Sequence, residues 1–250
     1  MPSIDLNCDL GESFGAYTIG MDAEVLPFVS SANIACGFHA GDPSVMQKSV
    51  LLCKKCGVQV GAHPGLPDLQ GFGRRKMAIA PAEAEADVMY QVGALKAFCD
   101  AAGVPLHHVK PHGALYNMAA KDSELAAAIC RAVKAAAPEA MLLALSGSEM
   151  IKAAQALGLR VCSEVFADRG YQPDGTLVPR GKPGAIIENE EEAIARVLQM
   201  AKQGTVCAVD GSAVALQADS VCVHGDGPKA LAFVRKISAA LPAALEGCLQ

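Results

Sequence analysis

Short apolar runs alternate along the chain with longer segments in which apolar residues recur at helical spacing. Such runs are typical of buried strands, and the longer pattern is typical of helices that pack one face on a sheet. The runs predict strands at residues 3–9, 31–36, 58–63, 106–110, 140–145, 160–166 and 219–224. The helical pattern predicts helices at residues 22–27, 43–56, 81–103, 122–137, 148–157 and 189–203, and a last one after Pro228.

Capping residues indicate where several of these helices begin and end. Asp42 is a natural N-cap and Pro43 suits the first helical position, so a helix is expected to start there and to stop at Gly57. Asp122 is expected to cap the helix at residues 122–137 in the same way.

The order of the elements predicts an α/β fold built from parallel strand–helix–strand units. Residues 205–216 are the exception, because they predict a β-hairpin with Asp210 and Gly211 in a type I′ turn. No linker, repeat or low-complexity tract divides residues 1–250, so one domain is expected. A single parallel β/α barrel with seven or eight strands fits this length, and an open, doubly wound sheet is the alternative.

Composition narrows the classes of partner. The chain of 250 residues is 52% hydrophobic and 19% charged, with a net charge of −5 and with its Lys and Arg residues scattered singly. This charge argues against nucleic acid or an anionic membrane as the main partner. No segment reaches the roughly 18 apolar residues that span a bilayer, and no signal-peptide core is recognised. We therefore expect a cytoplasmic protein whose cysteines are reduced.

Polar clusters lie just after the predicted strands and before the following helices. In a parallel barrel these segments open on one face, which is the face that carries active sites. Four of the six histidines lie at such junctions, each beside Gly or Pro, and they are His39, His63, His112 and His224. Their common position predicts one shared site.

The residue types at these junctions limit the chemistry. Asp9, His39, His63 and His112 could work as acid and base, because imidazole titrates near neutral pH and a carboxylate can orient it. Three imidazoles and a carboxylate are also a plausible ligand set for a divalent metal, so metal binding stays open. Lys110 would place positive charge against an oxyanion or a phosphate.

Two further features could bind anions. Either Arg74 or Arg75, which follow the Gly-rich segment 71–73, could bind a carboxylate or a phosphate. Gly225 and Gly227 precede the last helix, whose N-terminus favours phosphate, although two glycines before a helix are common. The chain has neither a GxxxxGK[ST] P-loop nor a GxSxG motif, which argues against a P-loop nucleotide site and a serine hydrolase.

Six long stretches resemble the LamB/YcsF family, the family of the A subunits of 5-oxoprolinase. They occur in order from one end of the chain to the other and are DLNCDLGESFGAY (5–17), ANIACGFHAGDP (32–43), GAHPGLPDLQGFGRR (61–75), VKPHGALYN (109–117), EVFADRGYQPDGTLVPR (164–180) and ADSVCVHGDGP (218–228). The resemblance implies a seven-stranded β/α barrel similar to those of glycoside hydrolases and deacetylases.

The same resemblance implies an activity: ATP-dependent opening of 5-oxo-L-proline to L-glutamate, in a complex with two other subunits and with Mg²⁺ accompanying the ATP. ATP is needed because the lactam is an unstrained, resonance-stabilised amide. Phosphorylation of its carbonyl oxygen would make the ring carbon C5 electrophilic.

Residue chemistry suggests roles within that reaction. Asp9 with His39 or His63 would orient and deprotonate the attacking water. Lys110 and His112 would stabilise the oxygen that bears charge or phosphate. Asn7 would contact the lactam edge, Arg74 would pair with the substrate carboxylate, and Asp168 would orient a cationic group. With these three, the predicted substrate-binding residues include Glu12 and Asn33.

Two other functions fit the same residues. One is a metal-dependent deacetylase or amidohydrolase that acts alone, and the set of Asp and His residues supports this function. The other is a non-catalytic subunit that holds the substrate while its partners carry out the chemistry, and the missing nucleotide-binding motif keeps this interpretation open.

Overall fold

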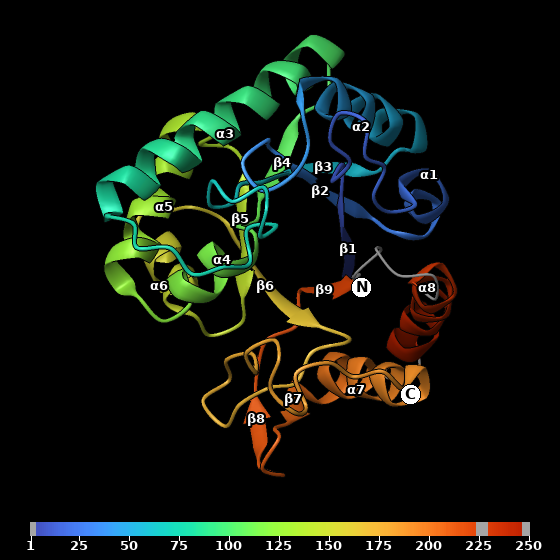
Figure 1. Ribbon diagram of the computed structural model, residues 1–250. Coiled ribbons are helices and arrows are strands. Elements are labelled where there is room, and N and C mark those ends of the chain that lie inside the picture. Colours follow the sequence, from blue (N-terminus) through green and yellow to red (C-terminus); the bar gives the residue numbers. More distant parts are fainter. Residues whose placement is uncertain (1–3, 224–229, 247–250) are drawn as a thin grey trace.

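Seven parallel strands close into a barrel in the computed structural model, which describes residues 4–223 and 230–246 (Figure 1). Around the barrel the strands follow the order β1-β2-β3-β4-β5-β6-β9, and β9 completes the circle by pairing with both β1 and β6. The predicted closed barrel is thus confirmed, and the open sheet is not found. The barrel strands are β1 Asp5–Leu10, β2 Ser31–Ala35, β3 Gln59–His63, β4 Leu106–Val109, β5 Met141–Leu145, β6 Val161–Phe166 and β9 Ser220–Val223.

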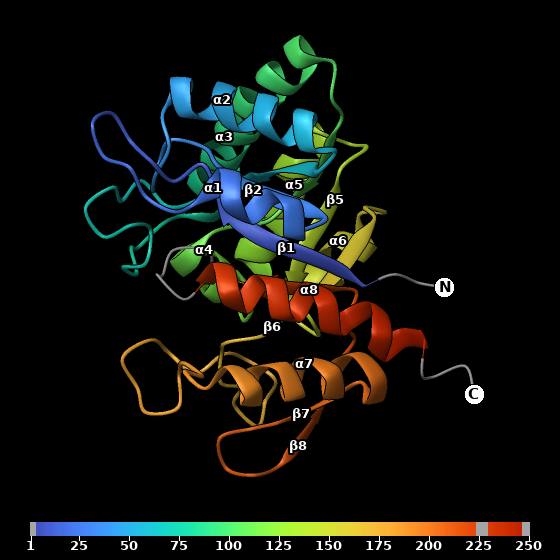
Figure 2. The ribbon, with the colours of Figure 1, turned by 90° about the vertical axis from the view of Figure 1, so that its right-hand side faces the viewer.

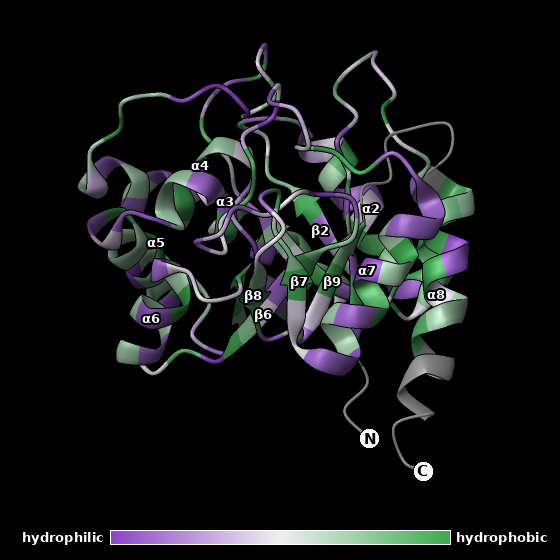
Figure 3. Ribbon diagram, turned by 90° about the horizontal axis from the view of Figure 1, so that it is seen from below, coloured by the Kyte–Doolittle hydropathy of each residue, from purple (hydrophilic) through white to green (hydrophobic). Residues whose placement is uncertain are grey.

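Helices surround the barrel and connect its strands (Figure 1). They are α1 Asp22–Val25, the 3₁₀ helix η1 Leu26–Phe28, α2 Pro43–Cys56, α3 Pro81–Ala102, α4 Gly113–Ala119, α5 Ser123–Ala136, α6 Glu149–Ala156, α7 Glu190–Gln203 and α8 Ala230–Glu246. Figure 3 shows that the helices carry both hydrophilic and hydrophobic residues, as expected for helices with one face on a core and one in water.

The predicted helix starts are confirmed at atomic detail. The Asp42 carboxylate accepts hydrogen bonds from two backbone N–H groups of the first turn of α2, and Pro43 occupies the first helical position. Gly57 ends that helix in the left-handed conformation, with φ 70°. Asp122 caps α5 in the same way, with two backbone N–H groups as donors.

The hairpin of β7 Thr205–Cys207 and β8 Ala213–Ala215 exists, but its turn is not the predicted type I′. The N–H of Ala208 donates to the carbonyl of Ser212, and that of Gly211 donates to the carbonyl of Ala208. A type I′ turn requires positive φ at both central residues, whereas within this loop only Gly211 has one, at 87°. The loop is therefore the three-residue kind, in which a left-handed glycine follows a type I turn.

One helix was not predicted. Helix α4 begins directly after β4, is seven residues long and has no side-chain cap, because His112 stands at its N-cap position without making the capping bond. Neither a capping residue nor a long apolar period was therefore present in the sequence to indicate it.

Polar side chains fill part of the barrel interior. Alternate residues of β1, namely Asp5, Asn7 and Asp9, face inward, since successive side chains of a strand point to opposite faces. The Asn7 amide nitrogen donates to Ser220 Oγ at 2.7 Å, and its oxygen accepts from Asn33 Nδ2 at 2.8 Å. The apolar core lies instead between the outer face of the barrel and the helices.

The loops that follow the carboxyl ends of the strands gather at one end of the barrel, on the left in Figure 2. The polar clusters of the sequence lie in these loops, which is the arrangement that a parallel barrel predicts. Within the described part of the chain, no helix combines the length and the apolar character needed to cross a membrane.

Candidate active site

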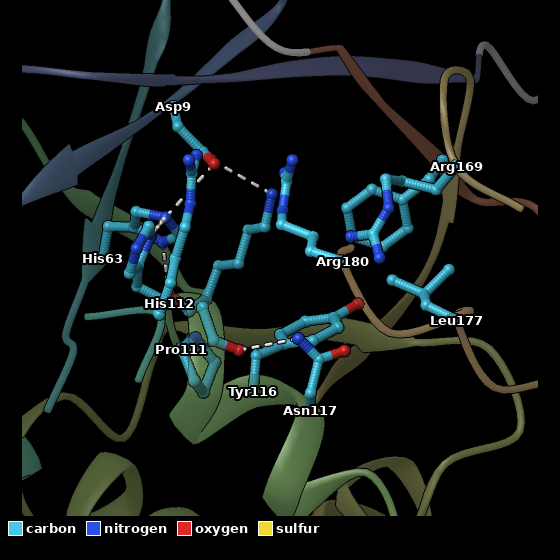
Figure 4. Close-up of a pocket in the computed structure, with 13 residues that line it drawn as sticks. Asp9, His63, Pro111, His112, Tyr116, Asn117, Arg169, Leu177 and Arg180 are labelled. Carbon is cyan, nitrogen blue, oxygen red and sulfur yellow. Dashed lines mark hydrogen bonds and ion pairs between the residues drawn. The ribbon is translucent and has the colours of Figure 1, made fainter. Parts of the chain in front are cut away.

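A pocket opens at the carboxyl ends of the strands, where the polar clusters were expected to converge (Figure 4). Asp9 lies on β1, His63 ends β3, Lys110 and His112 follow β4, and Arg74 comes from the loop after β3. All five line this pocket. The structure thus brings five of the ten predicted site residues that it describes together around one cavity.

Lys110 lies beneath the pocket within a ring of acceptors. Its Nζ is 2.7 Å from Glu164 Oε1 and 3.1 Å from each of Asp9 Oδ1, Asn7 Oδ1 and Cys222 Sγ. An ammonium group has three hydrogens to donate. All of them are therefore directed at the protein itself.

The pKa of Lys110 lies well above its ordinary value. Burial by itself lowers the pKa, because a buried ammonium loses its hydration, but the nearby Asp9 and Glu164 carboxylates outweigh that effect. Glu164 is fully buried and accepts a hydrogen bond from the Tyr116 hydroxyl at 2.6 Å. Lys110 therefore stays charged and helps to fix the Asp9 carboxylate at the floor of the pocket.

His63 and His112 share a hydrogen bond beside Asp9. His63 Nε2 lies 2.9 Å from His112 Nδ1 and 3.3 Å from Asp9 Oδ2. The outer nitrogens of the two rings face backbone carbonyls, with His63 Nδ1 2.7 Å from the oxygen of Lys110 and His112 Nε2 2.8 Å from that of Phe72. Because a carbonyl oxygen only accepts, both outer nitrogens carry a hydrogen.

The two rings differ in their surroundings. His63 Nε2 lies next to the Asp9 carboxylate as well as His112 Nδ1. Burial lowers the pKa of His112 well below its ordinary value, and the neighbouring His63 lowers it further. His112 is therefore neutral, and His63 is the ring that contacts the acid.

His39 lies flat against His112, with ring centroids 3.7 Å apart and an angle of 3° between the planes. Its side chain is buried, and within the described part of the chain neither ring nitrogen has a hydrogen-bond partner. Its Nε2 is 3.7 Å from Glu12 Oε1, which is too long for a hydrogen bond. Burial and the two neighbouring imidazoles lower the pKa of His39 well below its ordinary value, so the ring is neutral.

Glu12, His39, His63 and His112 offer four ligand atoms within 4.8 Å of one another, which raises the question of a metal. A transition-metal ion lies about 2.0–2.1 Å from the nitrogen that binds it, along the lone pair in the ring plane. The parallel, stacked rings of His39 and His112 cannot both meet that condition for one ion. The inner nitrogens of His63 and His112 are also bonded to each other. As arranged, these residues form an imidazole cluster and not a metal centre.

The loop at residues 71–74 holds these rings in place. Phe72 has φ 55°, in the left-handed region that residues other than glycine rarely adopt, and its carbonyl receives the hydrogen bond from His112. A Cβ at Gly73 would lie 2.7 Å from His39 Cβ and 2.8 Å from His112 Cδ2. The backbone of this loop is thus pressed onto the ring stack, and only glycine fits there.

The two adjacent arginines of this loop have different surroundings. Arg74 lines the pocket, and its guanidinium lies over the Phe72 ring, 4.9 Å from the centroid. Arg75 forms an ion pair with Asp68 and lines a separate depression. The structure therefore directs Arg74, and not Arg75, toward the site.

Five of the predicted residues that the structure describes do not line the pocket. Asn7 and Asn33 are fully buried below it, and Asn33 Nδ2 donates to Asp9 Oδ1 at 2.8 Å, so they orient Asp9 from beneath. Glu12 lies beside the imidazole cluster, and Asp168 belongs to the segment that follows β6. His39 is likewise absent from the lining, because it is stacked behind another ring.

The predicted phosphate-binding turn, with Gly225 and Gly227, lies outside the residues 4–223 and 230–246 that the structure describes. The same holds for His224, the fourth histidine that was expected at the site.

Several residues of the site were not predicted. Glu164 and Tyr116 form the buried support of Lys110, and Figure 4 shows the Arg180 side chain extending from the segment after β6 toward Asp9. Glu164 could have been suspected from the sequence, because it is the one charged residue of strand β6. Arg180 could not have been, since it lies in a long polar loop with other charged residues.

Comparison with known proteins gives matches over nearly the whole chain. The sequence model of the LamB/YcsF family matches residues 4–246. A protein of Clostridium beijerinckii, named as the A subunit of 5-oxoprolinase, is 60% identical over 241 residues, which are 96% of this chain and 94% of that protein. A protein of Bacillus subtilis with the same name is 58% identical over 244 residues, which are 98% and 95% of the two chains. The crystal structure of a lactam utilization protein from Thermus thermophilus superposes with a TM-score of 0.90, at 52% identity and with 97% of each chain covered.

Proposed function

The chain belongs to the LamB/YcsF family, and from this premise we propose that it is the subunit of a 5-oxoprolinase that opens the lactam ring of 5-oxo-L-proline to L-glutamate. The observation that carries the proposal is the hydrogen-bonded His63–His112 pair beside Asp9, at the floor of a pocket in a chain so similar to proteins of that name. An amide bond is broken in this reaction, and such a site holds both a base and an acid within reach of one another.

Ring opening requires that water lose a proton and that the ring nitrogen gain one. Asp9 lines the pocket and accepts the proton of the attacking water, while His63 donates a proton to the departing ring nitrogen. The proton taken up by Asp9 then passes to His63 across the 3.3 Å contact between them. The site returns to its starting state without an external acid or base.

The other residues of the pocket bind and position. Arg74 pairs with the carboxylate of the substrate through one edge of its guanidinium fork, and the other edge faces the outer part of the site. Lys110 is a positioning residue in this account, because its three hydrogens are directed at protein acceptors. It fixes Asp9 and contributes positive charge beneath the developing oxyanion.

The reaction is coupled to ATP in this proposal, because the unstrained amide is otherwise a poor electrophile. Phosphorylation of the carbonyl oxygen by ATP releases ADP and activates C5. Water then adds to C5, the C5–N bond breaks, and the resulting acyl phosphate releases phosphate to a second water. Two partner subunits complete the enzyme, with Mg²⁺ accompanying the ATP.

The experiment measures glutamate formed from 5-oxo-L-proline and ATP by the complete complex, with this chain present, omitted or substituted. We expect no turnover without the chain, and a loss of about 10²- to 10⁴-fold in kcat for His63→Ala and Asp9→Asn. Lys55→Gln is the matched control, because Lys55 is exposed in the last turn of α2, away from the pocket.

Other results would select the alternatives. Full turnover without this chain would refute the proposal. A rise in KM at unchanged kcat for His63→Ala would indicate a subunit that only holds the substrate. Glutamate release by the chain alone, with a divalent metal and without ATP, would indicate a metal-dependent amidohydrolase.

A further inference from the structure

A second, wider cavity adjoins the candidate active site. Its volume is about 370 Å³, whereas the pocket above Asp9 and Lys110 measures about 40 Å³. A single water needs about 10–15 Å³ on such a scale, so the inner pocket admits a few atoms and the outer one a much larger group. The two share six lining residues, which are Arg74, Gly113, Asn117, Arg169, Leu177 and Arg180.

The lining of this outer pocket is strongly cationic. Among the described residues that form it there is no carboxylate, although the chain as a whole has 26 acidic and 21 basic residues. Its basic residues come from three separate segments of the chain and are Arg74, Lys76, Lys121, Arg169 and Arg180. Neutral polar groups, the Asn117 and Gln172 amides and the Thr176 hydroxyl, complete the polar part of the wall.

The surroundings of Lys121 and Arg169 show how much of this positive charge the protein itself compensates. Lys121 is 3.3 Å from the exposed carboxylate of Asp174, which screens it in part. Arg169 is buried, and two of its N–H groups donate to the carbonyls of Ala185 and Val178, so its guanidinium is fixed. Burial, followed by repulsion from Arg180, lowers the pKa of Arg169 to about 10, although the nearby Asp168 carboxylate acts in the opposite direction. The guanidinium stays charged at neutral pH.

From this arrangement we propose that the outer pocket is a phosphoryl-binding subsite, in which Arg74, Lys76 and Arg180 hold phosphate oxygens while the reacting carbon lies in the inner pocket. This inference rests on the proposed function and names the chemistry that the site recognises. Guanidinium groups bind phosphate oxygens in pairs, and a lysine adds a point charge. The phosphoryl group belongs either to the phosphorylated lactam or to a nucleotide, and both present the same oxygens.

The volumes of the two cavities also support placing the lactam in the inner pocket and the phosphoryl group in the outer one. A phosphoryl group does not fit beside a lactam ring in about 40 Å³, whereas an outer cavity of about 370 Å³ is within the range of small-molecule sites. Arg74 and Arg180 line both cavities, so they stand where the carbon and the phosphorus of an activated lactam would be joined.

The test is calorimetric titration of the full chain with inorganic phosphate, ADP and ATP at constant ionic strength, with chloride as the ionic control. We expect saturable binding of phosphate that weakens at least tenfold in Lys76→Gln and in Arg180→Gln. In Lys55→Gln, which removes the same charge at the other end of the barrel, binding should not change. Circular dichroism of each variant checks that the fold is retained.

The three ligands distinguish the source of the phosphoryl group. Equal affinities for phosphate, ADP and ATP would assign the subsite to the activated lactam. ATP binding at least tenfold tighter than phosphate, and equally sensitive to both substitutions, would assign it to a nucleotide. Either result supports a phosphoryl subsite. The proposal would be overturned if the chain did not bind phosphate. It would also be overturned if Lys55→Gln weakened phosphate binding as much as Lys76→Gln and Arg180→Gln do.

The proposed function is tested separately. In the complete complex, loss of turnover when the chain is omitted bears on the function, whereas the phosphate titration uses the chain alone. A chain that is required for turnover but does not bind phosphate would refute the subsite and leave the function standing.

Discussion

Glu164 Oε1 lies 2.7 Å from Lys110 Nζ in the interior of the barrel, and both side chains are shielded from water. The two residues come from β6 and from the end of β4, so their contact crosses the barrel below the pocket. A buried charge that loses its partner is costly, which makes this pair a sensitive probe of the site.

We expect Glu164→Gln and Lys110→Met each to lower the free energy of unfolding by about 3 kcal/mol, because each leaves the opposite charge buried without its main partner. The double variant should lose clearly less than the sum of the two, since both charges are then absent. Urea unfolding of the four proteins measures this cycle. Additive losses would show that Glu164 and Lys110 are not coupled.

Tyr116→Phe removes one hydrogen bond to Glu164 and should lower the free energy of unfolding by only about 1 kcal/mol.

Stability should fall when the pH drops below about 6.5. Burial lowers the pKa of His108 from 6.5 to about 3, and it also lowers the pKa values of His39 and His112. The unfolded chain binds protons on these residues near pH 6.5, whereas the native chain does so only at much lower pH. The unfolded state is therefore favoured by about 1.4 kcal/mol per pH unit for each such group as the pH falls.

Urea unfolding at pH 7.5, 6.5, 5.5 and 4.5 measures this dependence. His108→Gln cannot take up the proton, so its stability should fall less steeply with decreasing pH than that of the parent chain. Equal slopes would contradict the assignment of His108 as a buried neutral imidazole.

Metal content should stay well below one ion per chain. Among the residues that the structure describes, the parallel rings of His39 and His112 and the hydrogen bond between His63 and His112 keep the one group of candidate ligands from surrounding an ion. Elemental analysis after dialysis, and melting with and without a chelator, provide the measurement. A tightly held ion in one-to-one ratio, lost together with several degrees of melting temperature on chelation, would show that the cluster rearranges to bind it.

Two glycines should respond in opposite ways to substitution by alanine. A Cβ at Gly61 on β3 would lie 2.0 Å from His108 Nε2 in the interior, so Gly61→Ala should cost about 2 kcal/mol or more. Gly93 lies within α3 with nothing within 4 Å of an added Cβ. Gly93→Ala should stabilise the protein by about 0.5–1 kcal/mol, because alanine favours the helix. Thermal unfolding compares the two, and a similar loss in both would contradict the packing at β3.

The barrel was predictable because its signals are local and repeated. Each strand is a short apolar run, and capping residues such as Asp42 and Asp122 start the helices that follow. The convergence of Asp9, His63 and His112 was predictable too, since parallel strands in a barrel place the residues after them at one end.

What could not be predicted depends on contacts between distant segments. Nothing near Lys110 in the sequence indicates that Glu164 lies against it, 54 positions further on. Cys222 lies in an apolar run and is buried, but its sulfur also contacts Lys110. The orientation of the His63 and His112 rings depends on two backbone carbonyls, which no side-chain pattern reveals.

Strand β9 pairs with both β1 and β6 and so supplies the final piece of the circle. Because it begins at Ser220, a growing chain must extend past that residue before the two neighbouring strands gain their second partner. Until then both expose unpaired backbone groups, to which strands of other nascent chains can add. The interval between emergence of β6 and emergence of β9 from the ribosome is therefore when this protein most needs protection from aggregation.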